Sequence, residues 1–298
     1  MLEHISDFPA WCLVQIPGRL KWLQEDARGK VWLAALPQLL SDLVSAWQLE
    51  LGAPFEKATV SYVAPAIRGT EHVVLKVQWP HEESAHEADA LRTWDGDGAV
   101  RLLAQDESRH ALLLELCRPG TALATSKSVD PIAVVIDLLP RLWKRAGPPF
   151  KSLITEAKEW SATLYSDWEA AGKICERRLI DATAEYIEQL TGSGREDVLV
   201  HQDLHGDNII AAERQPWLAI DPKPLVGERE FSPAPIIRSF EFGHSRAEVI
   251  KRLDRLSLEL GLDRDRVRAW AIVQTVAWSF SSRLAERHYD TVRWLLAA

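Results

Sequence analysis

The 298-residue chain contains only three cysteines, Cys12, Cys117 and Cys175, and they lie far apart in the sequence. No CxxC pair is present, so the sequence predicts neither a disulfide framework nor a zinc site. A reducing cytoplasm is therefore the expected environment.

Long apolar runs are also missing. The best candidates, residues 31–40 and 269–280, are shorter than a bilayer requires, and each contains a proline or a glutamine. The N-terminal MLEHISDFPAW has no basic segment before an apolar run, unlike a secretory signal. We therefore expect a soluble protein that does not bind a membrane.

Excess positive charge is lacking as well, since the formal net charge is −8. Nucleic acid is an unsuitable partner, because phosphate backbones require clustered Lys and Arg. An acidic balance favours a cationic substrate. However, the acidic excess lies mainly in residues 1–118, which carry 11 basic and 17 acidic side chains. Residues 225–298 carry 12 basic and 10 acidic side chains.

Polar side chains are concentrated in residues 201–221, which read HQDLHGDNIIAAERQPWLAID. The pattern predicts a strand, a polar loop, a strand, a turn and a third strand ending before Asp221. Asp203 and Asn208 share the loop, so three side chains with oxygen atoms can face one point. Such a set suits Mg²⁺ held by Asn208 and Asp221, while Asp203 accepts a proton from a substrate hydroxyl.

This stretch has two other interpretations. Asp and Asn often only form turns, which is the simpler explanation for Asp203 or Asp221 taken alone. A zinc site at His201 and His205 would need a helix, but a Val-rich strand precedes them, Gly206 follows, and no HExxH motif is present. We expect these histidines to hold the loop through hydrogen bonds.

Lys76 lies in a second informative stretch, the apolar strand Val73–Val77. Burying an ammonium group there is costly unless it meets an anion. Glu87 follows in a predicted helix over residues 84–92 and could orient Lys76 toward phosphate groups. The alternative is that Glu87 is one more solvated helix charge. The turn expected at residues 65–70 has Gly69 as its only glycine, so it lacks the GxGxxG pattern of a phosphate-covering loop.

The remaining pattern is largely helical. We expect a helix from Val31 to Gly52 interrupted at Pro37, and strands near residues 59–64, 72–78, 100–104 and 111–116. Helices are expected at residues 131–145, 152–171, 174–190, 246–260, 263–282 and 283–296, with Asp130 capping the first of these, and a loop is expected at 222–231. With 47% hydrophobic residues, the chain can bury a large core in two lobes.

His201, Asp203, His205, Asn208 and Asp221 resemble the catalytic loop and metal-binding Asp of aminoglycoside phosphotransferase-like kinases. Residues 87–103 and the stretch WLAIDPKPLVGE at 217–228 are similar to the aminoglycoside/hydroxyurea antibiotic resistance kinase family, which contains streptomycin 6-phosphotransferases. The resemblance extends from about Ser61 to Phe231. Gln202 and Ser232 depart from the family pattern, which usually has Gly and Asp there; these changes concern the loop's shape and the choice of substrate.

The resemblance implies an α+β, two-lobed protein-kinase-like fold. Residues 1–118 would form a nucleotide-binding lobe with a small antiparallel sheet, and residues 119–298 a mostly helical lobe with the catalytic loop and substrate site. Glu115 and Cys117 would form the hinge, offering a carbonyl and an N–H group to adenine. Lys76 would hold phosphate.

The implied activity is transfer of the ATP γ-phosphoryl group to a small-molecule hydroxyl with Mg²⁺, and the expected acceptor is an aminoglycoside such as streptomycin. Glu228, Glu230 and Glu241 could meet its guanidinium groups, although pairing with Arg229, Arg238 or Arg246 explains them more simply. The alternatives are a kinase for another hydroxylated metabolite and a nucleotide-binding pseudokinase scaffold. The residues do not indicate an oligomeric state.

Overall fold

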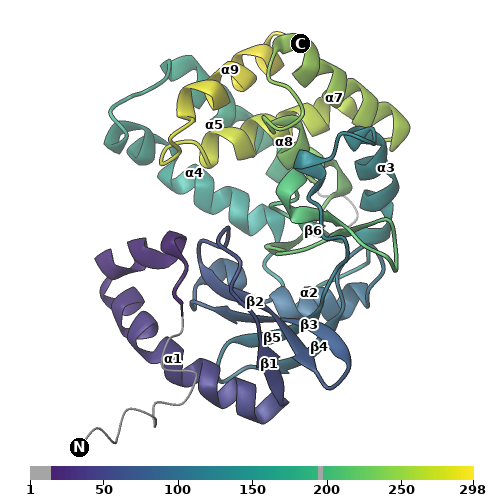
Figure 1. The fold of residues 1–298 in the computed structure, drawn as a ribbon. Helices are drawn as coiled ribbons and strands as arrows, with labels where there is room; N and C mark the ends of the chain where they lie inside the picture. The colour runs from purple at the N-terminus through teal and green to yellow at the C-terminus, as the bar shows by residue number, and fades with distance from the viewer. Residues whose placement is uncertain (1–14, 194–196) are drawn as a thin grey trace, which may run out of the picture. The chain divides into compact units, whose positions relative to one another are not determined.

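The structure is a computed structural model that describes residues 15–193 and 197–298, and it is drawn in Figure 1. The chain forms two compact units. The first consists of the described residues up to Ala88 together with Val100–Leu116. The second consists of Asp89–Ala99 and the described part of Cys117–Ala298.

The first unit is built around a five-stranded sheet with the order β1-β2-β3-β5-β4. Every neighbouring pair is antiparallel. The strands are β1 (Leu49–Leu51), β2 (Ser61–Arg68), β3 (Glu71–Gln78), β4 (Leu102–Asp106) and β5 (Ala111–Glu115). The central strand β3 therefore has partners on both sides, which fixes the position of Lys76 within the sheet.

The β2–β3 hairpin differs from the expected one. Strand β2 continues through Pro65 to Arg68, so the predicted turn at residues 65–70 shrinks to Gly69 and Thr70. Gly69 has a φ of 63°, a value that glycine adopts without strain. Pro65 cannot donate, but its carbonyl accepts from Gly52 N–H at 2.8 Å. A proline was a misleading turn signal here because pairing on both sides maintains the strand.

Helix α1 (Ala27–Trp47) also differs from its prediction. It follows the 3₁₀ helix η2 (Gly18–Glu25), is capped by Asp26 and runs through Pro37 without interruption. It ends at Gln48, after which β1 begins, so the expected continuation to Gly52 was wrong. Packing explains its continuity: the buried Leu33, Leu36, Leu40 and Leu43 belong to the same core as the sheet.

Alternation along β3 separates the two faces of the sheet. Val73, Leu75 and Val77 belong to the core that includes α1 residues. Because successive side chains point to opposite faces, Lys76 and Gln78 lie on the other face. The sequence of β3 thus places a charged and an amide side chain together, away from α1.

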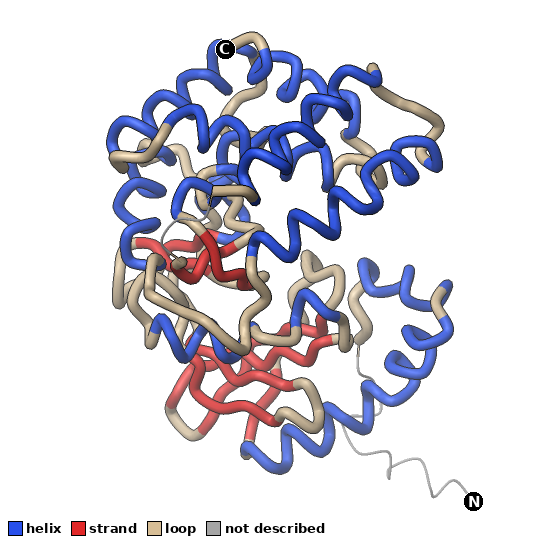
Figure 2. The backbone as a smooth tube through the Cα atoms, turned by 180° about the vertical axis from the view of Figure 1, so that it is seen from behind, coloured by secondary structure: helices blue, strands red, loops and turns tan. Residues whose placement is uncertain are grey.

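The second unit is mostly helical, as the blue segments of Figure 2 show, with two small antiparallel sheets. Strand β6 (Val198–His201) pairs with β9 (Pro224–Gly227), and β7 (Ile209–Ala211) pairs with β8 (Trp217–Ala219). The helices are α2 (Glu87–Trp94, which begins in the first unit), α3 (Pro131–Leu142), α4 (Leu153–Ala170), α5 (Arg177–Thr191), α6 (Ala234–Ile237), α7 (Arg246–Glu259), α8 (Arg264–Ala277) and α9 (Ala285–Leu296). Short 3₁₀ turns occur at Glu82–Ser84, Leu123–Thr125, Gly206–Asn208 and Arg229–Phe231.

Most of these elements follow the sequence pattern. Asp130 caps α3 by accepting from Ile132 N–H at 3.0 Å, as predicted. The expected strand, loop, strand, turn and strand over residues 198–221 is confirmed by β6, β7 and β8. The predicted loop at 222–231 was wrong, since it contains β9, whose pairing with β6 lies outside any local pattern.

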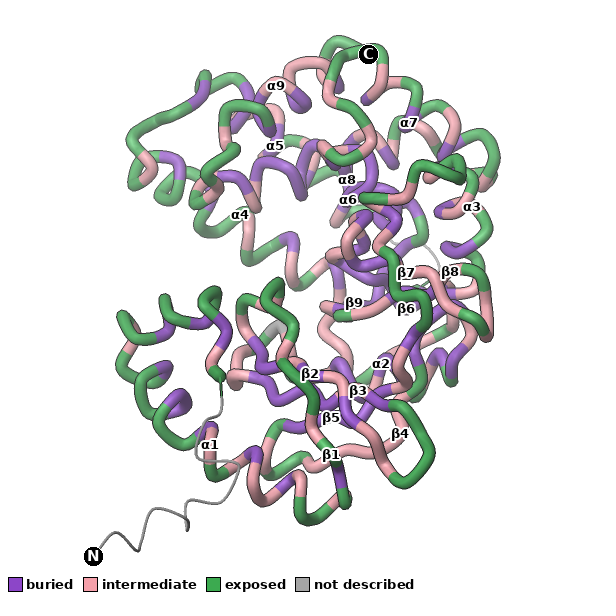
Figure 3. The backbone as a smooth tube through the Cα atoms, viewed as in Figure 1, coloured by how far each residue is buried: buried purple, intermediate pink, exposed green. Residues whose placement is uncertain are grey.

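Helix α8 is the centre of the second unit. Every residue from Ala269 to Val276 is buried (Figure 3), and the helix packs against α5, α6, α7 and α9. Trp270 joins residues of α4, α5, β6 and β9 in one apolar cluster. This packing holds the β6–β9 sheet, and with it the loop after β6, in a fixed place.

Within the described ranges, no helix has both the length and the apolar character needed to cross a membrane. Cys117 and Cys175 are buried and form no disulfide among the described residues, while Cys12 lies outside the described residues.

Candidate active site

The loop after β6 is held by the ring of His201. Its Nδ1 lies 3.2 Å from the backbone N of Asp203, and its Nε2 lies 3.0 Å from the carbonyl oxygen of Ile220. Because the Asp203 N–H must donate to Nδ1, the ring proton is on Nε2 and is donated to Ile220. Burial lowers the pKa of His201, which keeps this neutral form. The predicted role of His201 in holding the loop is thus confirmed.

Asn208 and Asp221 are brought together by the β7–β8 ladder. The carbonyl of Asn208 accepts from Ile220 N–H at 3.0 Å, one residue before Asp221. The side-chain Nδ2 of Asn208 donates to the Asp203 carbonyl oxygen at 2.9 Å. This bond orients the amide, so that Oδ1 lies on the opposite side of the group. Asp221, at a φ of 55°, is held in the left-handed region.

The donor chemistry of this pair fits Mg²⁺. An amide oxygen and a carboxylate oxygen are hard ligands of the kind that Mg²⁺ takes in small number, with the remaining positions left to water or phosphate. The residues that could hold such an ion are therefore Asn208 and Asp221, and the hydrogen bond of Asn208 with Ile220 brings their positions in the chain together.

The carboxylate of Asp203 is surrounded by cationic side chains. Lys223 Nζ lies 3.5 Å from Oδ2, and Arg238 Nη2 lies 3.8 Å from Oδ1. Both cations also lie over the ring of Trp278, at 4.8 and 4.9 Å from its centroid. The Asp203 side chain is 17% exposed, so this carboxylate is reachable from solvent while being held on several sides.

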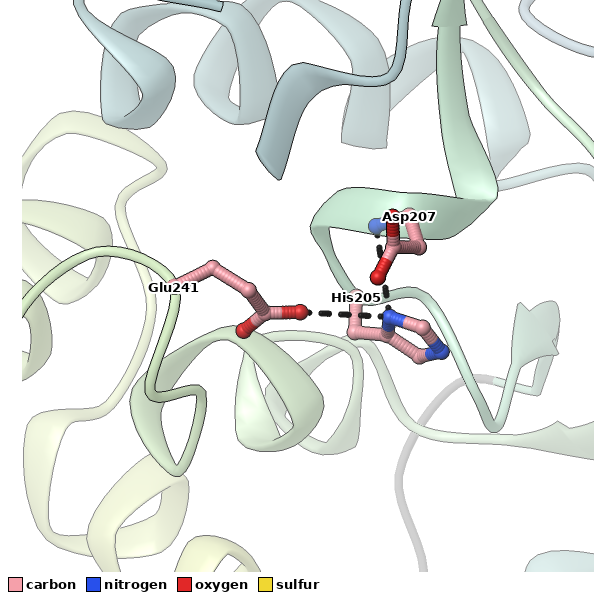
Figure 4. A group of neighbouring side chains, drawn as sticks. All are labelled: His205, Asp207 and Glu241. Atoms are coloured by element: carbon pink, nitrogen blue, oxygen red, sulfur yellow. Dashed lines mark hydrogen bonds and ion pairs between the residues drawn. The ribbon is translucent and has the colours of Figure 1, made fainter. Parts of the chain in front are cut away.

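His205 forms a second polar group with Glu241 and Asp207 (Figure 4). Its Nδ1 lies 3.3 Å from Glu241 Oε1 and 3.3 Å from the backbone N of Asp207. Burial lowers the pKa of His205, but the Glu241 and Asp203 carboxylates outweigh that effect, so the pKa lies above its usual value. The carboxylates therefore favour the protonated form of His205, which does not bind metal, and we interpret the group as polar contacts that secure the loop.

The predicted partners Lys76 and Glu87 form an ion pair within the first unit. Lys76 Nζ lies 2.7 Å from Glu87 Oε1 and 2.5 Å from Oε2. Gln78 Nε2 donates to the same Oε2 at 2.6 Å. The side chains of Lys76 and Glu87 are 7% and 2% exposed, so Glu87 is not a solvated helix charge. The Glu87 carboxylate is therefore held by both a cation and an amide.

Glu115 and Cys117 lie where β5 ends. Glu115 pairs with Val73 of β3, and its N–H donates to the carbonyl of Arg101 at 3.1 Å. Cys117 is buried, and the following Gly120 donates its N–H to Ala211 at 3.0 Å. The backbone on both sides of this short segment is therefore fixed by sheet pairing and by loop contacts.

The two departures from the family pattern are accommodated by packing. Gln202 is buried; its carbonyl accepts from Gln274 of α8 at 2.7 Å and its N–H donates to the Lys223 carbonyl at 3.1 Å. These backbone bonds do not depend on the side chain. Ser232 is also buried and accepts a hydrogen bond from Trp143 at 2.9 Å.

Glu228 has partners other than the expected arginines, whereas Glu241 lies close to Arg238 as well as to His205. Glu228 is buried and bonded to Arg266 and to the indole N–H of Trp270. Glu241 faces His205. Glu230 is buried in the turn after β9. Glu228 is consequently a structural group within the second unit.

Sequence reasoning did not place Lys223, Arg238 or Trp278 near Asp203. Lys223 lies in the quoted Asp-Pro-Lys string, which was a usable signal. Arg238 and Trp278 had no such signal: Arg238 approaches Asp203 from 35 positions away in the chain, and Trp278 packs against Lys223 and Arg238 from 75 positions after Asp203.

The comparisons with known proteins agree on one family. The profile of the aminoglycoside/hydroxyurea antibiotic resistance kinase family matches residues 49–283. A hydroxyurea phosphotransferase from Kitasatospora aureofaciens is 38% identical over 89% of this chain and 80% of its own length. A streptomycin 6-kinase from Streptomyces griseus is 35% identical over 86% of this chain and 87% of its own length.

Solved structures show the same fold. The crystal structure of a choline kinase from Streptococcus pneumoniae superimposes with a TM-score of 0.63 and 14% sequence identity. The match covers 88% of this chain and 98% of that one. The α+β, protein-kinase-like fold expected from the sequence is confirmed, with its small antiparallel sheet and its largely helical remainder.

Proposed function

Because the chain belongs to the aminoglycoside/hydroxyurea antibiotic resistance kinase family, we propose that it transfers the γ-phosphoryl group of ATP to a hydroxyl group of a small antibiotic-like molecule. The observation that carries the proposal is the convergence of Asp203, Asn208 and Asp221. Hydrogen bonds join Asn208 to Asp203 and to Ile220, the residue before Asp221. Phosphoryl transfer needs this combination of a proton acceptor and metal-holding oxygens.

Asp203 is the proposed proton acceptor. Its backbone is fixed by His201 and by Asn208, while its carboxylate stays partly exposed. A carboxylate held in this way can orient an acceptor hydroxyl and take its proton as the oxygen attacks phosphorus. General bases of this kind contribute about 10²–10⁴-fold to rate.

Asn208 and Asp221 are the proposed Mg²⁺ ligands. When bound, Mg²⁺ supplies positive charge that neutralises the phosphate oxygens. Asn208 would offer Oδ1, because its Nδ2 is already used by the Asp203 carbonyl. The same bond ties the metal-holding amide to the backbone of the proposed base.

The first lobe, proposed to be residues 1–118, would bind the nucleotide through Lys76, Glu87, Glu115 and Cys117. Residues 119–298 would form the lobe that carries the catalytic loop and the substrate site. Lys76 would contact the nucleotide phosphates, with Glu87 holding its ammonium group in place. Glu115 and Cys117 would present a backbone carbonyl and N–H group to adenine. Their fixed backbone supports that role.

The acceptor is proposed from the two relatives named above. The similarity to a streptomycin 6-kinase supports streptomycin as the acceptor. The similarity to a hydroxyurea phosphotransferase supports a smaller hydroxylated compound. A scaffold without activity is disfavoured, because the proposed base, metal ligands and Lys76–Glu87 pair are all present. We place the activity in the cytoplasm, where ATP is available and the buried thiols of Cys117 and Cys175 stay reduced.

The test is a screen of acceptors with ATP, in the presence of Mg²⁺ and in the presence of a chelator. Streptomycin, other aminoglycosides, hydroxyurea, sugars and amino alcohols would be examined by mass spectrometry for the gain of one phosphoryl group. We expect at least one acceptor to be phosphorylated, and only with Mg²⁺. ATP binding without phosphorylation of any acceptor would instead support the scaffold function.

A further inference from the structure

Arg252 of helix α7 is a charged residue that is only 2% exposed. Its guanidinium donates hydrogen bonds to two separate places in the chain between α6 and α7. Nε and Nη2 reach the carbonyl oxygen of Ile237 at 3.3 and 3.0 Å, and Nη2 also reaches that of Ser239 at 3.0 Å. Nη1 reaches the carbonyl oxygens of Phe242 and Gly243 at 2.9 and 2.8 Å. One side chain thus binds both ends of a single short segment.

The shape of the guanidinium explains why an arginine suits this place. A buried cation is unfavourable unless its N–H groups find acceptors, and four carbonyl groups supply them here. Burial lowers the pKa of Arg252 to about 10, so the group stays charged at neutral pH. Because its N–H groups form a rigid planar fork, it fixes the two ends of the segment relative to each other.

The segment held in this way, residues 237–243, meets the catalytic loop through polar side chains at two points. Arg238 Nη2 lies 3.8 Å from Asp203 Oδ1. Glu241 Oε1 lies 3.3 Å from His205 Nδ1, as Figure 4 shows. The segment therefore contacts both the proposed base and the histidine two positions after it.

A third and closer contact is apolar. A Cβ atom on Gly206 would lie 2.6 Å from Cζ of Phe242 and 3.0 Å from the backbone N of Ala124. A side chain does not fit at such distances, so only glycine lets the phenyl ring rest directly on the backbone of the loop. Gly206 stands in the chain between the proposed base Asp203 and the proposed metal ligand Asn208, so the ring supports the backbone that carries both.

We propose that Arg252 is a positioning residue, which holds the 237–243 segment in the shape that keeps the catalytic loop in place for phosphoryl transfer. This inference rests on the proposed function. Arg252 acts through the backbone of the segment, which in turn contacts Asp203, His205 and Gly206. A misplacement of about 1 Å at a reacting group can lower a rate about 10²-fold. Arg252 should therefore control kcat.

The first test compares Arg252→Lys and Arg252→Met with the wild type, using ATP and the acceptor identified in the screen. Lysine keeps the charge but its single nitrogen reaches only one end of the segment, whereas methionine reaches neither end. We expect kcat to fall about 10²-fold in Arg252→Met and by a smaller factor in Arg252→Lys. Arg255→Met is the matched control and should keep wild-type kcat, because Arg255 lies on the same helix but forms partly exposed ion pairs with Asp130 and Glu259.

The number of ATP-binding sites, measured without Mg²⁺, separates positioning from a general loss of structure. None of the residues proposed to bind ATP belongs to the contacts described above, so each folded molecule should bind ATP with wild-type affinity. The values of kcat are therefore expressed per ATP-binding site. A purely structural role would reduce the number of sites and leave kcat per site unchanged.

Phe242→Leu tests the contact chain without changing Arg252. Leucine lacks the Cζ atom that rests on Gly206, but it keeps the backbone carbonyl that Arg252 binds. This variant should also lower kcat per site. Combined with Arg252→Lys, the two losses should multiply to less than the product of the single effects, because both act on one contact.

Hydrogen–deuterium exchange supplies a readout that does not depend on catalysis. The N–H groups of Asp203 and Asn208 are hydrogen-bonded within the loop. Peptides covering residues 201–208 should exchange faster in Arg252→Lys and in Phe242→Leu than in the wild type, while peptides from β3 keep their rates.

Unchanged exchange of the loop in Arg252→Lys, wild-type kcat per site in both Arg252 variants, or independent effects of Arg252→Lys and Phe242→Leu would overturn the inference. A wild-type protein that phosphorylates no acceptor would instead refute the proposed function. The exchange measurement would then decide by itself whether Arg252 holds the loop.

Discussion

Replacing Lys76 by Met should destabilise the first unit strongly. The ammonium group meets both oxygens of Glu87, and both side chains are almost completely buried. Without Lys76, the Glu87 carboxylate loses the ammonium group that meets both of its oxygens, while the amide of Gln78 still donates to it. Removal of one partner from a buried ion pair costs about 3–5 kcal/mol. That is a large part of the roughly 5–15 kcal/mol by which folded proteins are stable.

The measurement is urea unfolding of four proteins: wild type, Lys76→Met, Lys76→Met/Glu87→Leu and Arg68→Met. The double variant removes both charges and should recover most of the lost stability. Arg68 is the matched control, because it pairs with Glu71 on the same hairpin but is 35% exposed. Its loss should cost less than about 1 kcal/mol.

The comparison with Arg68→Met decides whether the reasoning holds. If Lys76→Met lowers the free energy of unfolding no more than Arg68→Met does, the Lys76–Glu87 pair is not buried as described. The double variant also separates stability from function. It should fold nearly as well as the wild type but bind ATP poorly, since the cation proposed to contact the nucleotide phosphates is gone.

Two further predictions concern the metal and pH. Asp221→Asn should raise the Mg²⁺ concentration needed for half-maximal transfer at least about tenfold. Asp207→Asn is the control and should leave that concentration nearly unchanged. An equal effect of the two substitutions would indicate that the metal binds at the group of His205, Asp207 and Glu241 instead. Burial, with the positive charge of Arg238 next, lowers the pKa of His288 to about 4. The unfolded chain then binds a proton that the folded chain excludes, so about 3 kcal/mol of stability present above pH 6.5 should be lost as pH falls to 4. His288→Phe should flatten urea-unfolding stability over that window, and an unchanged slope would contradict the assignment.

The catalytic loop could be predicted from the sequence because its contacts are local. Residues 198–221 supply the strands, the turn and the hydrogen bonds among His201, Asp203 and Asn208. The Lys76–Glu87 contact spans only eleven positions and joins a strand to the next helix. Patterns of strand alternation and helix periodicity are sufficient for contacts of this range.

The surroundings of Asp203 could not be predicted, because they depend on the packing of distant elements. Arg252 illustrates the difficulty: a charged residue in a helix is usually solvated, yet here it is buried and organises the segment that carries Arg238. Strand β9 was missed for the same reason, since its partner β6 lies 23 or more positions earlier. The predictions at Pro37 and Pro65 were wrong because tertiary packing outweighs the local tendency of proline to interrupt a helix or a strand.

The most direct test of the central claim is single-turnover phosphoryl transfer by Asp203→Asn. The asparagine keeps the size and the backbone hydrogen bonds of the loop but cannot take a proton. We expect ATP to bind as in the wild type while transfer slows about 10²–10⁴-fold. Transfer at close to the wild-type rate would contradict the role of Asp203 as the base, and with it the proposed arrangement of the site.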